Sequence, residues 1–338
     1  MAAAVNTGRE RWVLGVDSGG SGLRVALADP ARPVPAAGLR RSREPVRTGP
    51  AGIDAGHLLE QLLPMARSLL ADAGGGALAS VAIGAAGMAT LGDGLRAELP
   101  GALRDALGVR RLALAADAVT AYAGALGQRP GAVVAAGTGM VATGTDLRGW
   151  RRADGWGHLL GDCGGGAWIG RAGLEAALRA HDGRRGGSAA LLTAAEALLG
   201  PAEGLPGRVY PRTDRPAVLA SFAPEVARCA AAGDGVSAGI LRLAAGHIAE
   251  AAAAVCPPAG ADGAAPEVAL TGGLFHTGEP LLVPLRAELA AQLPSARLTP
   301  AAGDPLAGAV LIASALAGGS LVLPSHPTLL HVPAEQGR

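Results

Sequence analysis

The most informative absence in this sequence is lysine. The chain has 338 residues and 29 Lys plus Arg, and every one of these 29 is an arginine. A Schiff-base lysine is therefore impossible, which excludes pyridoxal-phosphate enzymes and lysine aldolases. A Walker A loop and a protein-kinase core also need a lysine at the nucleotide phosphates, so both are excluded. If the protein handles nucleotide phosphates, it does so with glycine backbone, hydroxyl groups and a metal.

Aromatic residues, net charge and cysteine are also scarce. Aromatics make up 2% of the chain and the formal net charge is +1. Both values argue against nucleic-acid partners, because base stacking uses aromatic rings and phosphate contacts use an excess of positive charge. The three cysteines, Cys163, Cys229 and Cys256, form no CxxC pair. So few cysteines fit a reducing compartment, and the N-terminus has no apolar signal-peptide region. We therefore expect a cytoplasmic protein.

The apolar content indicates a large core. Hydrophobic residues make up 49% of the chain, and the length suits two domains or one large one. An uncharged stretch, 305–325, is the one candidate for a membrane span in the C-terminal region. Its helical part, about a dozen residues from Leu306 to Ala317, is too short to cross a bilayer. We expect a buried C-terminal helix and no membrane partner.

Two segments, 11–28 and 131–145, share one design. In each, an apolar strand is followed by a turn of Gly, Ser and Thr residues and by a second apolar strand. A dinucleotide-binding fingerprint would open a helix after the glycines, so we predict hairpins instead. The similarity indicates a weak internal repeat on the scale of a domain.

The rest of the chain alternates between helix and strand patterns, which predicts an α/β fold. The expected elements are helices at 54–73, 93–107, 118–126, 169–181, 191–199, 216–232, 234–255 and from Asp304-Pro305 onward, and strands at 81–84, 111–115 and 268–270.

Two glycine turns are candidate phosphate sites. In Asp17-Ser18-Gly19-Gly20-Ser21, backbone N–H groups and the Ser21 hydroxyl suit phosphate oxygens, and Asp17 could hold a hydrated Mg²⁺. A plain hairpin turn explains the same residues equally well. The Gly137-Thr138-Gly139 turn is weak alone, but its place in the repeat makes Thr138 and Gly139 further phosphate candidates.

Two more candidates follow buried strands. Asp117 stands directly after one strand, where it is either the N-cap of the next helix or a general base at the mouth of the sheet. Gly272 and Gly273 follow the strand at 268–270, and their backbone would allow a flat ligand such as adenine to approach closely. An ordinary turn explains this pair too.

A glycine-rich loop, 155–170, is the fifth candidate. Three of the four tryptophans lie between positions 150 and 168. An aromatic ring, an acid and glycine backbone suit a sugar, because acids bind hydroxyl groups and bare backbone fits closely. The alternative is a structural loop with packed tryptophans.

Together the five segments resemble the N-acetylglucosamine kinase and BadF/BadG/BcrA/BcrD ATPase-like family of the sugar kinase, heat-shock ATPase and actin superfamily. The resemblance runs from about Val13 to Ala317, and its most specific part is the loop Gly155-Trp156-Gly157-His158-Leu159-Leu160-Gly161-Asp162. It implies two ribonuclease-H-like domains with an interdomain cleft. The expected boundaries are 1–122 plus about 305–338 for one domain, and 123–304, with helical insertions, for the other.

The resemblance also implies a reaction, the 6-phosphorylation of N-acetylglucosamine by ATP and Mg²⁺. ATP would be bound by Gly19, Gly20, Ser21, Thr138, Gly139, Gly272 and Gly273, with the metal held through water by Asp17. The amino sugar would be bound by Asp117, Gly155, Trp156, Gly157 and Asp162. Asp117 would be the catalytic base, and the family suggests a homodimer.

Departures from the family pattern leave alternatives open. Met140 stands where the family usually has Ser, and Cys163 where it usually has Glu. The substrate could therefore be glucosamine or a related hexosamine. A BadF-type activator ATPase would need cysteines placed for an iron–sulfur cluster, a spacing that this chain lacks. A non-catalytic sugar sensor is the third reading, against which Asp117 and both phosphate turns count.

Overall fold

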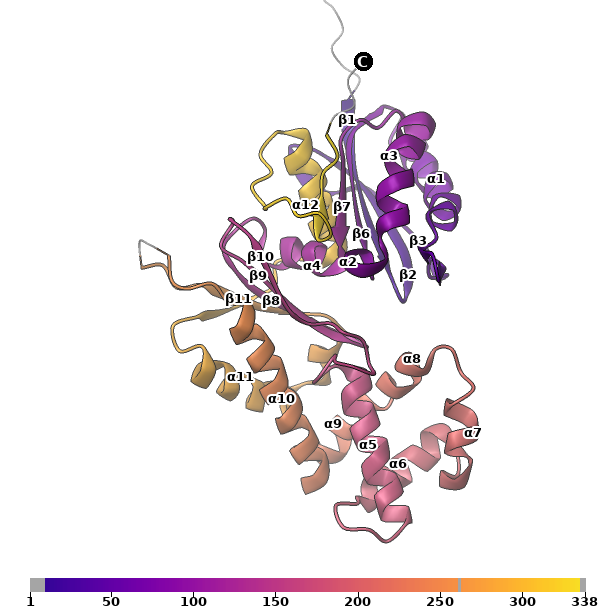
Figure 1. The fold of residues 1–338 in the computed structure, drawn as a ribbon, viewed down its shortest axis with the longest axis vertical. Coiled ribbons are helices and arrows are strands. Elements are labelled where there is room, and N and C mark those ends of the chain that lie inside the picture. The colour runs from indigo at the N-terminus through magenta and orange to yellow at the C-terminus, as the bar shows by residue number, and fades with distance from the viewer. Residues whose placement is uncertain (1–9, 261–262, 335–338) are drawn as a thin grey trace, which may run out of the picture. The chain divides into compact units, whose positions relative to one another are not determined.

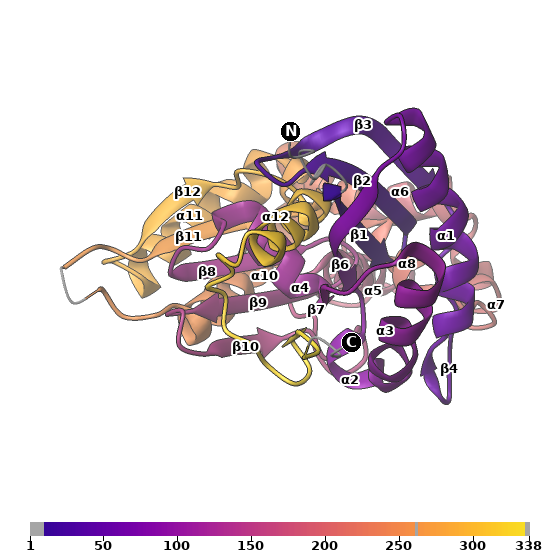
Figure 2. The same cartoon turned by 90° about the horizontal axis from the view of Figure 1, so that it is seen from above.

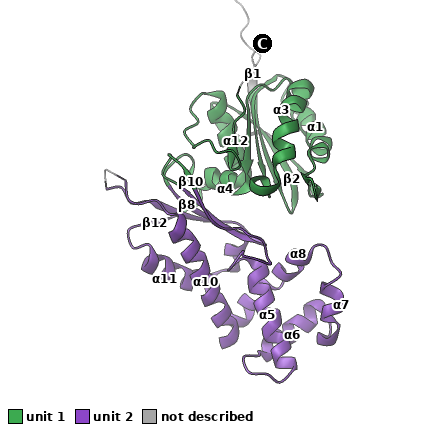
Figure 3. Cartoon of the chain, viewed as in Figure 1, with its two compact units in different colours: residues 1–130, 145–150, 300–338 green, residues 131–144, 151–299 purple. Residues whose placement is uncertain are grey.

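The computed structural model describes residues 10–260 and 263–334, and the chain divides into two compact units (Figure 3). Unit 1 takes in residues 1–130, 145–150 and 300–338, and unit 2 takes in residues 131–144 and 151–299. Each unit is therefore built from segments that lie far apart in the chain.

A six-stranded sheet forms the centre of unit 1, in the order β13-β7-β6-β1-β2-β3. Strand β1 is antiparallel to β2 and parallel to β6, and β6 is parallel to β7. A separate two-stranded sheet pairs β4 with β5. The strands are β1 (Glu10–Gly19), β2 (Gly22–Asp29), β3 (Arg32–Ser42), β4 (Thr48–Gly49), β5 (Gly52–Ile53), β6 (Ala77–Ala85), β7 (Leu112–Ala116) and β13 (Leu330–His331).

Helices cover both faces of this sheet. Figures 1 and 2 show α1 (Ala55–Asp72) and α3 (Asp93–Leu107) on one face and α12 (Pro305–Ala317) on the other. A Cβ on Gly15 of β1 would lie 2.6 Å from Val310 Cγ2, so this glycine lets α12 approach the strand closely. The short helix α2 (Met88–Leu91) and helix α4 (Asp117–Leu126) complete the unit.

Unit 2 repeats the strand order of unit 1. Its sheet runs β10-β9-β8-β11-β12, and β8 is parallel to β11. The order β10-β9-β8-β11-β12 corresponds to β3-β2-β1-β6-β7 of unit 1. If the five strands of each set are numbered by their place in the chain, both sheets have the order 3-2-1-4-5. The predicted internal repeat is therefore a repeat of topology. The strands are β8 (Gly131–Ala136), β9 (Met140–Thr145), β10 (Trp150–Asp154), β11 (Glu267–Thr271) and β12 (Arg297–Pro300).

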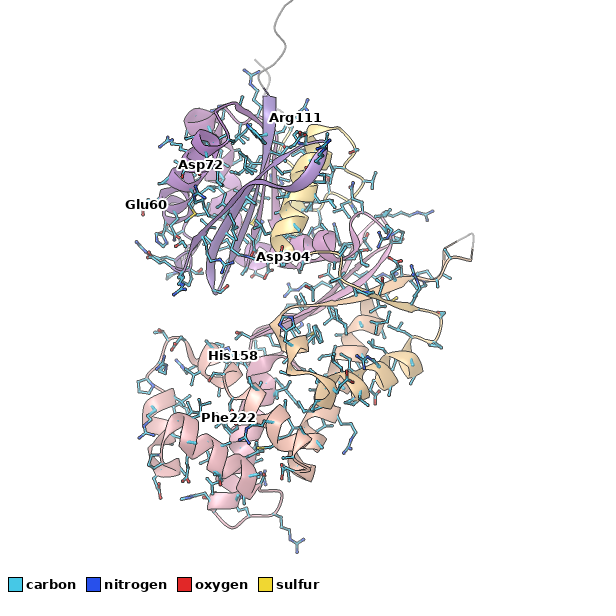
Figure 4. The ribbon with its side chains drawn as sticks, turned by 180° about the vertical axis from the view of Figure 1, so that it is seen from behind. Glu60, Asp72, Arg111, His158, Phe222 and Asp304 are labelled. Atoms are coloured by element: carbon cyan, nitrogen blue, oxygen red, sulfur yellow. The ribbon has the colours of Figure 1, made fainter. Side chains whose placement is uncertain are left out.

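The helices of unit 2 pack around a core that includes the fully buried Phe222 (Figure 4). They are α5 (Gly166–His181), α6 (Ala189–Leu199), α7 (Leu205–Val209), α8 (Arg215–Ala220), α9 (Ala223–Ala231), α10 (Gly235–Val255) and α11 (Glu279–Gln292), with 3-10 turns η1 (Ala202–Gly204) and η2 (Gly273–Thr277). The single helix predicted at 216–232 is wrong, because it is broken into α8 and α9. Pro224 lies in the first turn of α9, where its missing N–H is harmless; inside a continuous helix it would remove a hydrogen bond.

One described helix, α10, is long and apolar enough by length and composition to cross a membrane. It also carries ten buried residues and packs against α9, α11 and α5. Helix α12, which was predicted to be a buried C-terminal helix, has eight buried residues, and the prediction is confirmed. Both are explained as core helices of their units.

Candidate active site

Asp17 and Asp117 lie at the same edge of the unit 1 sheet. Residue Asp17 of β1 pairs with Gly84 of β6, and Gly84 pairs with Ala115 of β7, two residues before Asp117. These three strands are parallel, so their carboxyl ends meet at one edge, where α/β proteins bind ligands. Two strand spacings, about 10 Å, separate β1, which carries Asp17, from β7, which Asp117 follows.

Asp17 forms an ion pair that the sequence analysis missed. Arg24 donates to Asp17 Oδ2 from Nε at 2.9 Å and from Nη2 at 2.6 Å, and its Nη1 donates to Asp304 Oδ2 at 2.5 Å. Burial raises the pKa of Asp17, while the Arg24 charge opposes that rise. The predicted hairpin could have indicated this ion pair, because a two-residue turn at Gly20-Ser21 places Arg24 opposite Asp17 on the neighbouring strand.

The glycine turn after β1 contains glycines that packing does not require. A Cβ at Gly19 or Gly20 would meet no atom within 4 Å. Gly22, in contrast, has a φ of 115°, and a Cβ there would collide with the backbone at Ser42. The fold therefore explains Gly22 and leaves open space over Gly19, Gly20 and the exposed Ser21.

Asp117 is the first residue of α4 and is half-buried. The N-cap is Ala116, and the Asp117 carboxylate accepts the neighbouring Ala118 N–H at 2.9 Å. Close packing sets the start of α4, because a Cβ on Gly84 would lie 2.5 Å from Thr120 Oγ1. The Asp117 carboxylate therefore lies at the sheet edge, at the start of α4 and directly after β7, which is the position predicted for a general base.

In unit 2 the Gly-Thr-Gly turn is attached to the N-terminus of α5. The carbonyl of Gly137 accepts the Gly166 N–H at 2.9 Å, and the carbonyl of Thr138 accepts the Ala167 N–H at 2.8 Å. These N–H groups belong to the first turn of a helix, which has no intrahelical partner for them. The turn therefore caps α5, and the positive end of the helix dipole lies directly behind it.

Two other predicted sites lie against this turn or against Ala136, the residue before it. A Cβ on Gly272, whose φ is 106°, would collide with the carbonyl oxygen of Ala136, just before the turn. A Cβ on Gly139 would lie 3.0 Å from Asp162 Cγ and closer still to Oδ2. The structure thus brings together, within unit 2, the turn proposed for adenine, the turn proposed for phosphates and the acid proposed for sugar.

Of the three clustered tryptophans, only Trp156 is free to meet a ligand, with 66% of its surface exposed. Trp150 donates to the Pro324 carbonyl at 2.7 Å and packs against Tyr122, while Trp168 packs against His247 and the core. The clustering in sequence therefore overstated the aromatic content of the site. The Arg152 guanidinium lies 5.2 Å from the Trp156 ring centre, a cation–π contact that covers one face of the ring.

The sugar-type loop ends at a strained residue. Asp162 has a φ of 53°, which is uncommon for a residue other than glycine. Its Oδ1 accepts the Gly157 N–H at 3.1 Å, so it binds the far side of the loop. Burial and, to a lesser degree, the nearby Asp154 raise the pKa of Asp162.

The positions that depart from the family pattern are explained in part. The Met140 side chain is buried in the unit 2 core, and the Met140 backbone lowers the pKa of Asp162 against the larger effect of burial. Burial raises the pKa of Cys163, and the charges of Asp154 and Asp162 raise it further, so the thiol stays protonated. Burial also raises the pKa of Cys229 and Cys256. Residues 10–260 and 263–334 contain no group of three His, Cys, Asp or Glu side chains that could hold a metal.

Solved structures share this architecture. A provisionally named N-acetylglucosamine kinase from Chromobacterium violaceum is 26% identical, with a TM-score of 0.65, over 90% of this chain and 99% of the other. A second provisionally named N-acetylglucosamine kinase, from Porphyromonas gingivalis, is 18% identical with a TM-score of 0.64, over 90% of this chain and 98% of the other. A ROK family glucokinase from Streptomyces griseus, solved with glucose and AMPPNP, is 20% identical with a TM-score of 0.51, over 89% and 98%. The expected α/β fold of two ribonuclease-H-like domains is confirmed.

Sequence comparison identifies the family. An N-acetylmuramic acid/N-acetylglucosamine kinase from Clostridium acetobutylicum is 42% identical over 69 residues, which span 20% of this chain and only 22% of that relative. The profile of the BadF/BadG/BcrA/BcrD ATPase family matches residues 14–313, most of the chain. The protein therefore belongs to the BadF/BadG/BcrA/BcrD ATPase family.

Proposed function

We propose that this protein is an ATP-dependent amino-sugar kinase that phosphorylates the 6-hydroxyl of N-acetylglucosamine. Family membership supports the use of ATP. The names of the relatives from Chromobacterium violaceum and Clostridium acetobutylicum support an amino sugar as the acceptor. We also propose that it acts in the cytoplasm as a homodimer, as the sequence resemblance implies.

The observation that carries this proposal is the position of Asp162 in unit 2. Its carboxylate accepts from Gly157 in the loop and lies against Gly139 in the Gly-Thr-Gly turn. A sugar kinase must hold its acceptor hydroxyl next to the phosphoryl group, because phosphoryl transfer depends mainly on positioning and charge stabilisation. One acid that joins a sugar loop to a phosphate turn provides such positioning.

For ATP, we propose that its phosphates contact Gly19, Gly20, Ser21, Thr138 and Gly139, and that its adenine lies against Gly272 and Gly273. The open space above Gly19 and Gly20 supports this role, because packing alone does not explain why these residues are glycines. The helix dipole of α5 behind the second turn also favours negative charge there.

Mg²⁺ fits the residues at Asp17. Arg24 donates only to Oδ2 of this half-buried carboxylate in the described hydrogen bonds, which leaves Oδ1 for a water of a hydrated cation. When bound, the ion would neutralise charge on the phosphate oxygens.

For the acceptor, we propose that Asp117 takes the proton of the sugar 6-hydroxyl as that oxygen attacks the γ-phosphorus. The bond between the γ-phosphorus and the bridging oxygen breaks, ADP leaves, and the proton remains on the Asp117 carboxyl group. Gly155, Trp156, Gly157 and Asp162 hold the sugar. The open face of Trp156 suits the apolar face of a sugar ring, and Asp162 suits its hydroxyl groups.

The experiment is an ADP-release assay over glucosamine, N-acetylglucosamine, N-acetylmannosamine, N-acetylmuramic acid and glucose, with phosphorus NMR to locate the new phosphate. We expect ADP release that depends on an amino sugar and a phosphate at its 6-oxygen. Preference for glucosamine or another hexosamine would revise the substrate and keep the reaction. Equal ADP release with and without every sugar would contradict the kinase proposal and favour an activator ATPase.

A further inference from the structure

Asp154, the last residue of β10, organises the loop that follows it. Its Oδ1 accepts the Asp162 N–H at 2.6 Å, and its Oδ2 accepts the Cys163 N–H at 2.8 Å. A longer contact, 3.5 Å, joins Oδ1 to the Trp156 N–H. One carboxylate thus ties the beginning of the loop to its end, although no sequence motif pointed to this residue.

We propose that Asp154 is a positioning residue that holds Asp162 in the orientation needed to bind the amino sugar. The proposal rests on the proposed function and adds to it a residue that acts through another. Asp154 makes its bonds to backbone N–H groups, so its role is to set where the Asp162 carboxylate lies.

The backbone shows why this anchor is needed. Both Asp154 and Asp162 have left-handed conformations, with φ of 58° and 53°. Such conformations persist in residues with side chains only where surrounding contacts enforce them. The two short, charge-assisted hydrogen bonds from the loop end to Asp154 are contacts of this kind.

The loop also leaves room for the carboxylate. A Cβ on Gly161 would collide with Asp154 Oδ1 and would lie 2.9 Å from Trp156 Cβ. Gly161 therefore has to be a glycine so that the Asp154 carboxylate can reach the N–H groups at the loop end. The residue that follows the anchor, Gly155, is held as well, because Arg152 donates to its carbonyl.

The chemistry of the side chain gives a graded test. A carboxylate presents two acceptor oxygens to two amides, whereas an asparagine presents one acceptor and one donor. Asp154→Asn should therefore keep one of the two anchoring bonds. Asp154→Gly removes both and still allows the left-handed backbone, so that loss of the carboxylate is separated from backbone strain.

The experiment compares these variants with Asp146→Gly, a control that removes an exposed carboxylate accepting the backbone N–H groups of Arg148 and Gly149. Calorimetry would measure the Kd of the preferred hexosamine without nucleotide and, separately, the Kd of AMPPNP. We expect Asp154→Gly to raise the sugar Kd about 10- to 100-fold, as the loss of a hydrogen bond between the sugar and a charged group does. The AMPPNP Kd should change less, Asp154→Asn should be intermediate, and the control should match the unsubstituted protein.

Hydrogen exchange at the Asp162 and Cys163 amides gives a readout that needs no sugar. Both amides should exchange slowly in the unsubstituted protein and much faster in Asp154→Gly. Unchanged exchange, or faster exchange with an unchanged sugar Kd, would overturn the positioning role alone. If the unsubstituted protein bound no hexosamine, the proposed function would fail together with this role.

Discussion

The carboxylate of Asp162 lies so close to the Cα of Gly139 that any side chain at position 139 would displace it. The two residues are 23 positions apart, in a turn and in a loop that were identified separately from the sequence. Their contact makes the phosphate-type turn and the sugar-type loop one piece of structure within unit 2.

Gly139→Ala should therefore impair the proposed reaction strongly. The added Cβ would force Asp162 or the turn to move, and a misplacement of about 1 Å can lower activity about 100-fold. Steady-state kinetics should show higher KM values for both sugar and ATP. Gly137→Ala is the matched comparison, since a Cβ there meets no atom within 4 Å, and its effect should be clearly smaller. Equal effects of the two variants would contradict the importance of the contact.

Asp117→Asn should lower kcat while leaving sugar binding detectable. A general base is commonly worth a factor of about 10² to 10⁴ in rate. The amide keeps the size of the side chain and its acceptor oxygen for the Ala118 N–H, so the start of α4 should survive. Stopped-time ADP assays and calorimetry with the sugar would separate the two effects. Near-normal turnover would remove Asp117 from the role of base, and Asp105→Asn, on the exposed end of α3, is the control.

Arg24→Gln should destabilise the protein in a pH-dependent way. Burial already raises the pKa of Asp17, so the folded state is penalised as pH rises through that pKa, and Arg24 reduces the penalty. Without Arg24 the pKa of Asp17 rises further. Below the pKa of Asp17 in the unfolded chain the carboxyl is protonated in both proteins, so the part of the difference that comes from the charge of Asp17 disappears.

The expected deficit is about 2 kcal/mol in the free energy of unfolding at pH 8, and much less toward pH 4. Urea denaturation at several pH values would measure it. Arg104→Gln, which removes an exposed partner of Asp105, should show no such pH dependence. A deficit that is constant with pH would mean that Arg24 acts through packing and not through its charge on Asp17.

Trp156→Ala should mainly affect the sugar KM, whereas Trp168→Ala should mainly affect the free energy of unfolding. Trp156 is mostly exposed, so its loss should change the free energy of unfolding by less than about 0.5 kcal/mol and raise the sugar KM. Trp168 packs on the core and on His247, so its loss should cost about 2 kcal/mol. Thermal unfolding and kinetics on both variants would check this. A stability loss in Trp156→Ala larger than in Trp168→Ala would contradict the assignment of their roles.

Local sequence patterns predicted the elements that are long or that begin at a clear capping residue. Asp54 and Asp304 cap α1 and α12 as expected, because the capping side chain and the N–H that it accepts lie within three residues. Short strands without an apolar run, such as β10 and β12, were not predicted. They exist because neighbouring strands pair with them, and a single sequence does not show that pairing.

The same division holds at the candidate site. The sequence alone determined the two glycine turns, the strand-end position of Asp117 and the composition of the loop from Gly155 to Asp162, because each depends on residues adjacent in the chain. Tertiary structure decided that Arg24 links Asp17 to Asp304, that Asp154 anchors Asp162, and that Asp162 contacts Gly139. These contacts form between segments that the folded backbone brings together. Packing and burial determine which residues meet there, and a local sequence pattern does not show this.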